Sequence, residues 1–386
     1  MYKAYKFRLY PSREQREMIN KNFGCSRFVY NHYLSVMKEN GVRNKFENIN
    51  DYTHNLQHEY SFLQEADSCQ IRKTLFHLDD NFQRFFKSGF GYPKFKSKFD
   101  KNAYTTSAVY SDYKEKHYCN IEVDLVGRKI KLPKLKWVSI RGYRNILEIK
   151  GKIMNATISR EKNGKYYVSV MYEVSVPFKT EMPTCVVGLD VGVKTLVTFS
   201  DGTFIENNRY LKKYEKRIKR TQRELSRKVK RSNNYYKCKQ KLAVLYSKLA
   251  NARKNYLHEI TKMITDTYDI ITTEKLNTQK MIETSTSKTL TKNILDSSFR
   301  EIIRQLEYKS KLKGKYFYQV DEYYPSSQIC SQCGHRDESY KDIGKRVYEC
   351  RECNNKIDRD LNASINIAFE GITKYMREVY SRENEY

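Results

Sequence analysis

The segment CVVGLDVGVKTLVTFSDGTFIE, residues 185–206, decides how the second half of the chain folds. It opens with a short apolar run that ends in Asp190, which predicts a buried strand with an acid at its tip. The residues that follow alternate around Asp201-Gly202, a turn typical of a β-hairpin. A second apolar strand, DIITTE at 269–274, also ends in an acid, Glu274. Two such strands indicate an α/β domain with carboxylates at the strand ends.

A third acid lies near the C-terminus, in DRDLNASINIAF at 358–369, where Asp360 stands at the expected start of a helix. Carboxylates from two strands and a helix can converge on a pair of Mg²⁺ ions, and two ions ~4 Å apart assist phosphodiester hydrolysis. Each acid alone also has a structural interpretation. Asp190 could simply end a strand, Glu274 could pair with a lysine, and Asp360 or Asn362 could cap the helix.

Four cysteines form the best-specified motif of the chain, two C-x2-C pairs separated by sixteen residues: Cys330, Cys333, Cys350 and Cys353. Four thiolates suit tetrahedral Zn²⁺ with Zn–S distances near ~2.3 Å, and a site with no open position is structural rather than catalytic. Gly334 and Asn354 follow the pairs, where each turn needs a residue that tolerates left-handed backbone. The alternative, two disulfides, needs an oxidising compartment. The other five cysteines are scattered singly along the chain, a pattern typical of buried free thiols in a reducing compartment.

Charge narrows the class of partner. The 386 residues carry 73 Lys and Arg against 45 Asp and Glu, a net charge of +28. This excess is spread along the chain and favours a polyanion, most simply nucleic acid, over a basic but merely solvated surface. The longest apolar runs are far shorter than the ~18 residues of a membrane helix, and the N-terminus does not resemble a signal peptide. We therefore expect no membrane association.

In the first half of the chain, the spacing of apolar residues changes from a strand pattern to a helix pattern and back to a strand pattern. Residues 3–10 read as a strand, and Ser12 with Gln15 forms a capping box that starts a series of helices reaching about Phe86. A basic loop follows at 89–100, and from about 104 to 180 the sequence is β-rich, with Asn163-Gly164 as a hairpin turn. If the first strand joins these later strands, the helices are an insertion between strands of a barrel or half-barrel.

Two segments are candidates for phosphate contacts. Residues 209–266 predict an antiparallel helix pair with its turn near 232–234, and between Lys212 and Arg231 there are eleven Lys or Arg against two Glu. Such a run is often only a solvated face. The predicted contacts are Lys212, Lys213, Arg217, Arg220 and Arg223 in this run and Lys94, Lys96 and Lys98 in the basic loop.

The sequence resembles the TnpB (OrfB) family of transposon-encoded proteins, which are related to type V CRISPR effectors. The resemblance is carried in the second half by GLDVGVKTLVTFSDG, TTEKLN, YYPSSQICSQCG and DRDLNASINIA, in that order. In the first half it is carried by YKFRLYPSREQ, CSRFVYNHYL, GYPKFKSK, KIKLPKLKWVSIR and GKYYVSV. It covers nearly the whole chain, and the order acid, cysteine pairs, acid at the C-terminal end is its most specific part.

The resemblance implies an α/β multidomain protein with an RNase H-like (RuvC) nuclease core. The implied domains are a β-barrel wedge domain at 1–11 and 101–182, a helical recognition domain at 12–100, the nuclease domain at 183–324 and 357–371, and a zinc ribbon at 325–356. The polar residues 372–386 are expected to form a tail without stable structure.

The resemblance further implies an RNA-guided DNA endonuclease that binds a noncoding guide RNA and cleaves double-stranded target DNA beside a short transposon-adjacent motif. The family's catalytic, magnesium-binding acids correspond to Asp190, Glu274 and Asp360, with two Mg²⁺ at the acids and one structural Zn²⁺ at the cysteines. Asp358 is a reserve candidate. Ser364 and Asn354 depart from the family pattern without touching a metal ligand. A monomer in the bacterial cytoplasm or nucleoid is expected.

Two alternatives remain open at this point. A regulator of the same family would bind DNA under RNA guidance without cleaving it, but such proteins typically lose one of the acids, and this chain keeps all three. A DNA-joining transposase shares the same core fold and would leave strand-transfer products rather than simple breaks.

Overall fold

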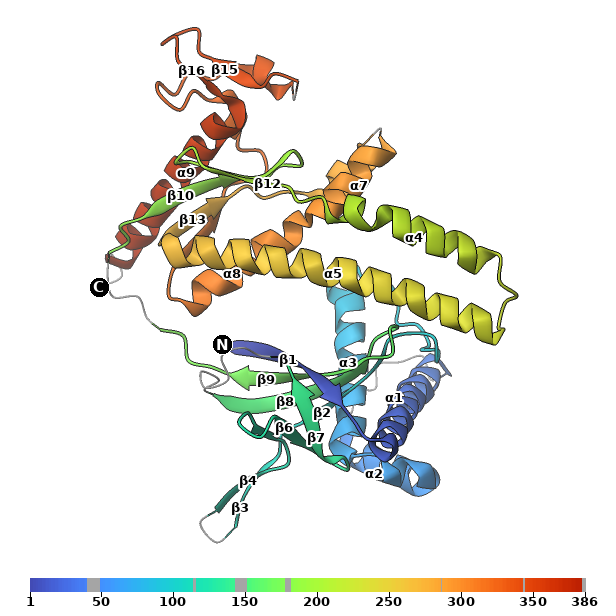
Figure 1. The fold of residues 1–386 in the computed structure, drawn as a ribbon. Coiled ribbons are helices and arrows are strands. Elements are labelled where there is room, and N and C mark those ends of the chain that lie inside the picture. Colours follow the sequence, from blue (N-terminus) through green and yellow to red (C-terminus); the bar gives the residue numbers. More distant parts are fainter. Residues whose placement is uncertain are drawn as a thin grey trace. The chain divides into compact units, whose positions relative to one another are not determined.

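The computed structural model describes residues 1–39, 49–113, 116–142, 151–177, 182–285, 287–342 and 344–383. The chain divides into two compact units, Met1–Ser175 and Val176–Tyr386, and each is described by itself (Figure 1). Glycine is common just past the end of a helix, so the sequence predicts that the first helix ends at Gly41, but Gly41 lies outside the described residues.

The first unit is built on a seven-stranded sheet with the order β2-β8-β9-β1-β7-β6-β5. Its strands are β1 (Tyr2–Tyr10), β2 (Asn102–Ser107), β5 (Glu122–Asp124), β6 (Lys129–Leu132), β7 (Lys136–Arg141), β8 (Lys152–Arg160) and β9 (Tyr166–Glu173). A separate hairpin is formed by β3 (Tyr110–Tyr113) and β4 (Lys116–Cys119). Every second side chain of a strand points to the same face of the sheet, and apolar residues at these positions, such as Phe7 and Leu9 of β1 and Val168 and Val170 of β9, pack in one core.

The first strand joins this sheet as the sequence predicts, because β1 pairs with β9 on one side and β7 on the other. The helices between β1 and β2 are therefore inserted between strands of one sheet. The expected barrel is not closed by hydrogen bonds, because β2 and β5 are the two edges of the sheet among the described strands. Periodicity alone could not predict this, since an open sheet and a barrel have the same alternation.

The inserted helices are α1 (Arg13–Glu39), α2 (Ile49–Glu59) and α3 (Ser68–Ser88), with a short 3₁₀ turn, η1 (Ser61–Glu65). The predicted capping box starts α1, since Gln15 N donates to Ser12 Oγ at 3.2 Å and Ser12 N donates to Gln15 Oε1 at 3.0 Å. Buried side chains such as Val29, Leu34 and Leu75 form a core of their own between these helices.

The second unit contains a five-stranded sheet with the order β12-β11-β10-β13-β14. Its strands are β10 (Val186–Asp190), β11 (Thr195–Phe199), β12 (Phe204–Glu206), β13 (Ile270–Thr273) and β14 (Tyr316–Gln319). β10 is parallel to β13 and antiparallel to β11, and β13 is parallel to β14. The predicted turn at Asp201-Gly202 joins β11 to β12, and both predicted acid-tipped strands are adjacent in the sheet.

The helix α9 (Arg359–Glu383) lies against β10 and β13 (Figure 1). Glycines on both sides of the contact allow the backbones to approach closely. A Cβ on Gly188 of β10 would lie 2.0 Å from the carbonyl oxygen of Ser364, and a Cβ on Gly371 would lie 1.8 Å from Thr272 Oγ1. The first turn of α9 is thereby fixed relative to the sheet that carries the other two acids.

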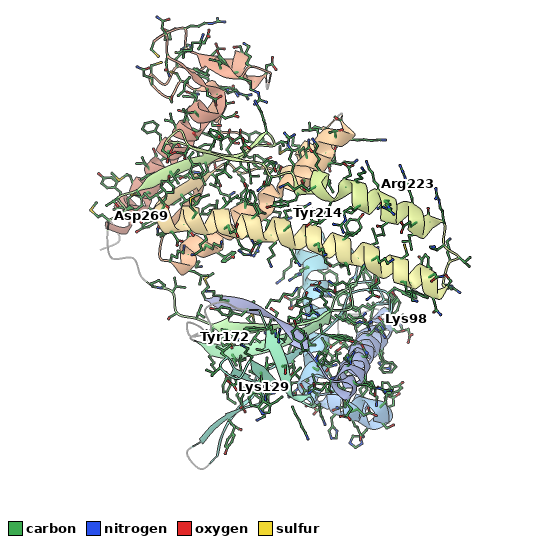
Figure 2. All side chains as sticks on the ribbon, in the orientation of Figure 1. Lys98, Lys129, Tyr172, Tyr214, Arg223 and Asp269 are labelled. Carbon is green, nitrogen blue, oxygen red and sulfur yellow. The ribbon has the colours of Figure 1, made fainter. Side chains whose placement is uncertain are left out.

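The described part of the second unit also contains a small hairpin of β15 (Val347–Glu349) and β16 (Lys356–Asp358) and the helices α4 (Tyr210–Ser226), α5 (Asn233–Thr267), α6 (Thr278–Glu283), α7 (Lys288–Ser297) and α8 (Phe299–Leu312). The helices α4 and α5 pack together as the charged stretch predicts, but the turn that joins them lies at 227–232, several residues before the predicted position near 232–234 (Figure 2). Leu245, Leu249 and Ile218 form the apolar seam between them, and the basic residues of α4 are exposed. No described helix is both long enough and apolar enough to cross a membrane.

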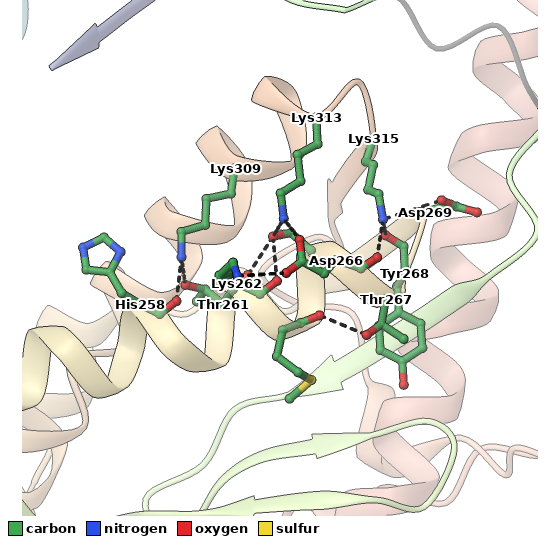
Figure 3. A network of polar contacts seen from close by, with 12 residues as sticks. His258, Thr261, Lys262, Asp266, Thr267, Tyr268, Asp269, Lys309, Lys313 and Lys315 are labelled. Carbon is green, nitrogen blue, oxygen red and sulfur yellow. Dashed lines mark hydrogen bonds and ion pairs between the residues drawn. The ribbon is translucent and has the colours of Figure 1, made fainter. Parts of the chain in front are cut away.

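Lysines that follow one another along α8 and the turn after it bind the C-terminal end of α5 (Figure 3). Lys309 Nζ donates to His258 O at 2.9 Å, Lys313 Nζ donates to Thr265 Oγ1 at 2.7 Å, and Lys315 Nζ donates to Tyr268 O at 2.9 Å. Of these partners, the Tyr268 carbonyl belongs to the C-cap of α5, where the last carbonyls lack helical partners and a cation is favourable. Because β13 begins at Ile270, these bonds also fix the start of the strand that leads to Glu274.

The C-terminal residues are helical through Glu383, so the expectation of a tail without structure over 372–386 is wrong for the described part. This part of α9 is held by β14, since Lys374 Nζ donates to Gln319 O at 2.8 Å and Tyr318 Oη donates to Glu378 Oε2 at 2.6 Å. Together with a ring contact between Tyr375 and Tyr316 of β14, these hydrogen bonds involve polar and aromatic side chains, which a low mean hydropathy does not reveal.

Candidate functional site

The four-cysteine cluster is compact. The ligand atoms of Cys330, Cys333, Cys350 and Cys353 all lie within 4.8 Å of one another. The Sγ atoms of Cys330 and Cys353 are 3.6 Å apart, and those of Cys333 and Cys350 are 3.5 Å apart. Four sulfurs bound to one ion at ~2.3 Å would have similar separations, so the cluster fits a structural zinc site.

Each cysteine pair is formed by the same backbone turn. Cys330 N donates to His335 O and Gly334 N to Cys330 O, while Cys350 N donates to Asn355 O and Asn354 N to Cys350 O, all at 2.8–3.0 Å. Gly334 has φ +78° and Asn354 has φ +57°, which confirms the predicted need for left-handed backbone at both turns. The turns direct backbone N–H groups at the sulfurs, which stabilises thiolates.

The surroundings of Cys330 and Cys333 shift the pKa values of their thiols in opposite directions. Burial raises the pKa of Cys330, but N–H groups of Cys333 and Gln332 outweigh it and bring this pKa to about 6. A hydrogen bond from the His335 backbone lowers the pKa of Cys333, but burial and the neighbouring cysteine sulfurs outweigh it and raise this pKa to about 12. Four thiolates at this spacing therefore repel one another unless a cation holds them.

The three acids, Asp190, Glu274 and Asp360, stand at the ends of adjacent elements. Asp190 is the last residue of β10, and Glu274 directly follows β13. Leu189 is opposite Thr273 in the parallel register, so the two acids occupy the next matching positions. Asp360 lies in the first turn of α9, the helix that packs on both strands.

The acids interact electrostatically. The pKa of Asp190 lies well above its ordinary value, because of burial first and then the nearby carboxylates of Glu274 and Asp360. Burial also raises the pKa of Glu274, and a hydrogen bond from Ser326 and the nearby Arg359 offset part of this effect. Three carboxylates with this mutual repulsion are suited to a divalent cation, which would replace the missing positive charge.

Arginines supply part of that charge. Arg346 Nη1 lies 3.7 Å from Asp360 Oδ2, and the Arg346 carbonyl accepts a hydrogen bond from Arg359 N at 2.8 Å. Arg346 comes from the segment between the two cysteine pairs. Among the described residues, only the four cysteines form a metal-binding group by the spacing of their ligand atoms, so the three acids are less closely gathered than a preformed cage.

Asp358, the reserve candidate, has a structural role. Its Oδ1 accepts hydrogen bonds from Asp360 N at 2.9 Å and Leu361 N at 3.1 Å, which is how a capping carboxylate satisfies the first N–H groups of a helix. Asp358 therefore caps the helix, in place of Asp360 or Asn362. Asn362 instead binds the first cysteine turn, accepting from Ser331 N at 2.9 Å and donating to Ile329 O at 2.7 Å.

Sequence analysis did not identify Ser326, Asn366 or Arg346. Ser326 Oγ donates to Glu274 Oε1 at 2.5 Å, and Asn366 Nδ2 donates to Ser326 O at 2.8 Å. All three residues lie inside or beside the quoted motifs around the cysteines and Asp360. Their positions near these motifs were the only signal in the sequence that could have marked them. Their contacts could not be predicted, because the partner residues are distant in the sequence.

The predicted phosphate contacts differ in how free their charges are. Lys212, Lys213, Arg217, Arg220 and Arg223 are exposed on α4, where Figure 2 labels Arg223. Arg220 shares its charge with Glu224 at 3.4 Å. In the basic loop, Lys94, Lys96 and Lys98 are all exposed residues, but Lys96 Nζ lies 3.7 Å from the Tyr30 ring centroid, and burial of the ammonium group lowers its pKa. Lys96 is thus the least available of the set.

Three family profiles match the chain. Residues 169–285 match the OrfB_IS605 profile, described as "Probable transposase", residues 299–367 match a "Cas12f1-like, TNB domain", and residues 1–45 match a "Helix-turn-helix domain" profile of the same OrfB_IS605 group. The TNB match spans the four-cysteine cluster and the acid-bearing start of α9.

Relatives match over almost the full length. The "Putative RNA-guided DNA endonuclease InsQ" of Escherichia coli strain K12 is 30% identical, over 95% of this chain and 92% of its own. A "Putative RNA-guided DNA endonuclease" of Streptomyces pristinaespiralis is 28% identical, over 96% and 89%. A solved Cas12f1-sgRNA-target DNA complex has the same fold, with a TM-score of 0.58 at 15% identity over 95% and 98%. The chain belongs to the TnpB (OrfB) family, related to type V CRISPR effectors.

Proposed function

We propose that this protein is an RNA-guided DNA endonuclease that cleaves double-stranded DNA with the three acids as its catalytic, metal-binding residues. The observation that carries the proposal is the placement of Asp190, Glu274 and Asp360 at the ends of β10, β13 and the start of α9, where Glu274 and Asp360 raise the pKa of Asp190 and Asp360 raises that of Glu274. The full-length relatives named RNA-guided DNA endonucleases support the same reaction.

The acids fit a pair of Mg²⁺ ions, because hard carboxylate oxygens with an excess of negative charge suit such cations. Bound there, the ions would supply an activated water and stabilise the leaving 3′ oxygen, with a 5′ phosphate as product. The chain's own contribution is to hold the carboxylates: Asp190 and Glu274 by the strand register, Asp360 by the cap from Asp358. Arg346 would balance the charge at Asp360.

The domain roles follow from the same proposal. The sheet of the first unit would be the wedge domain and its inserted helices the recognition domain. The second unit would be a RuvC-like nuclease core, and 325–356 the zinc ribbon. The guide RNA would specify the target by base pairing, while the protein holds the backbones. A monomer acting in the bacterial cytoplasm or nucleoid completes the proposal.

A cleavage assay tests it. The zinc-loaded protein is purified with its bound RNA, that RNA is sequenced, and a plasmid with a matching target is incubated with Mg²⁺. Double-strand breaks are expected from the wild type and none from Asp190→Ala. Tight DNA binding without breaks would instead support an RNA-guided regulator, strand-transfer products would support a transposase, and cleavage by Asp190→Ala would contradict the assignment of the acids.

A further inference from the structure

Ser326 is the side chain that holds Glu274. Its hydroxyl donates to Glu274 Oε1 at 2.5 Å, a short contact of the kind formed between a hydroxyl and a carboxylate. Ser326 is 4% exposed and begins the 3₁₀ turn η3 (Ser326–Gln328), which lies between β14 and the first cysteine pair. The bond occupies one carboxylate oxygen and so sets the direction of the other.

Asn366 of α9 fixes Ser326 in turn. Its Nδ2 donates to Ser326 O at 2.8 Å and to Ile329 O at 2.7 Å, and its side chain is 4% exposed. A buried amide with both bonds made holds its partners more rigidly than an exposed one. Ser326 is therefore attached to the same helix that carries Asp360.

The four-cysteine cluster belongs to the same connected set. Asn362, one helical turn before Asn366, also donates to Ile329 O, at 2.7 Å, and accepts from Ser331 N at 2.9 Å. These two asparagines clamp the segment 326–331 to α9, and Cys330 lies inside that segment. The cluster, the clamp and Ser326 form a continuous path to Glu274.

We propose that Ser326 is a positioning residue that orients Glu274 for the divalent cation, and that the asparagine clamp gives the four-cysteine cluster its influence on the acids. This inference rests on the proposed role of Glu274 as a metal-binding acid. Groups that hydrogen-bond a metal-binding side chain from behind fix its orientation, and their loss typically weakens metal affinity or activity ~10–100-fold.

The test compares Ser326→Ala with Ser326→Thr, which keeps the hydroxyl, and with Ser331→Ala, a matched removal of a serine hydroxyl that makes no bond to the acids among the described contacts. Mn²⁺ binding to the zinc-loaded full-length protein is measured by calorimetry, and the Mg²⁺ dependence of cleavage is measured separately. Ser326→Ala should require ~10-fold or more metal in both. Ser326→Thr and Ser331→Ala should stay within about threefold of the wild type.

Zinc content and target binding separate positioning from a general structural role. Both should be unchanged in Ser326→Ala, since the clamp uses the backbone of residue 326. The proposal is overturned if Ser326→Ala binds Mn²⁺ with wild-type affinity. It is also overturned if Ser326→Ala and Ser326→Thr both retain zinc and both lose Mn²⁺ affinity. Glu274→Gln tests the proposed catalytic role of Glu274 separately. If Glu274→Gln still cleaves DNA, the catalytic assignment is wrong. If Glu274→Gln is inactive while Ser326→Ala behaves like the wild type, only the inference about Ser326 fails.

Discussion

The carboxyl group of Asp190 lies at a buried position beside other acids, where its charged form is unfavourable for folding. Burial and two neighbouring carboxylates raise its pKa. An acid whose folded pKa is raised adds stability below its unfolded pKa, and this contribution is lost as the pH rises through the folded pKa. Above the unfolded pKa and without divalent cations, the Asp190 carboxyl therefore opposes folding, and on the proposed function this cost persists because the acid is needed there to bind cations.

We expect Asp190→Asn to abolish cleavage and to raise the melting temperature of zinc-loaded protein in magnesium-free buffer at pH 8, because it removes an acid whose ionisation is disfavoured by burial and by the neighbouring carboxylates. The gain should shrink as the pH falls toward the unfolded pKa of ~3.9, where the wild-type carboxyl is protonated too. Calorimetry across pH measures it. Asp201→Asn is the control of opposite sign, since burial raises the pKa of Asp201 but hydrogen bonds from Thr203 and Tyr268 outweigh it and lower this pKa. An unchanged or lower melting temperature for Asp190→Asn would contradict the argument.

Strands and helices place the acids, and the contact of α9 with the sheet depends on missing Cβ atoms. We expect Gly188→Ala to lower the free energy of unfolding by ~1–3 kcal/mol or more, since its Cβ would lie 2.0 Å from a backbone oxygen of α9. Chemical denaturation measures the change. Gly24→Ala in α1 is the matched control: nothing lies within 4 Å of its Cβ, so it should stabilise by ~0.5–1 kcal/mol. A neutral Gly188→Ala would show that α9 can move away from β10.

The four-cysteine cluster gives a second prediction for this scale. Cys350→Ser should lower the zinc content from one ion per chain to below one, because serine is a poor ligand for a cation that prefers thiolates. Hydrogen exchange should then rise in 326–358, and cleavage should fall through the clamp that leads to Glu274. Elemental analysis and exchange mass spectrometry measure these effects, with Cys238→Ser, a lone buried cysteine of α5, as the control. Full zinc content in Cys350→Ser would contradict the four-sulfur site.

The predictable elements are those whose signal is local. The apolar runs before Asp190 and Glu274, the capping box at Ser12 and the Gly334 and Asn354 turns depend on neighbouring residues, and the structure has them as expected. Ser326 and Asn366 act on partners 52 and 40 residues away, so no local pattern marks them. The helical end of α9 was not predicted, and the sequence left a barrel and a half-barrel open where the described strands form an open sheet, since both features depend on contacts between distant segments.

The whole molecule carries a net charge of +28, and α4 presents one exposed part of it. Replacing Lys212, Arg217 and Arg223 together by glutamine should weaken target binding and make the slope of log affinity against log salt less steep, by ~1 for each phosphate that is no longer neutralised. Fluorescence anisotropy at several salt concentrations measures both. Arg13→Gln, which removes a charge already paired with Glu17 at 3.3 Å, is the control and should change the slope least. An unchanged slope would mean that α4 is only solvated.

The close packing of α9 on the sheet also constrains how this chain can vary in length. Each residue of a helix turns it by ~100°, so an insertion or deletion between Asp360 and Gly371 would swing the carboxylate away from the strand tips or drive a side chain into Thr272. The number of residues between Asp360 and Gly371 is thus fixed by the two contacts that this helix makes with the sheet. Descendants of this sequence should gain or lose residues in the connecting loops and beyond Glu383, and keep that interval unchanged.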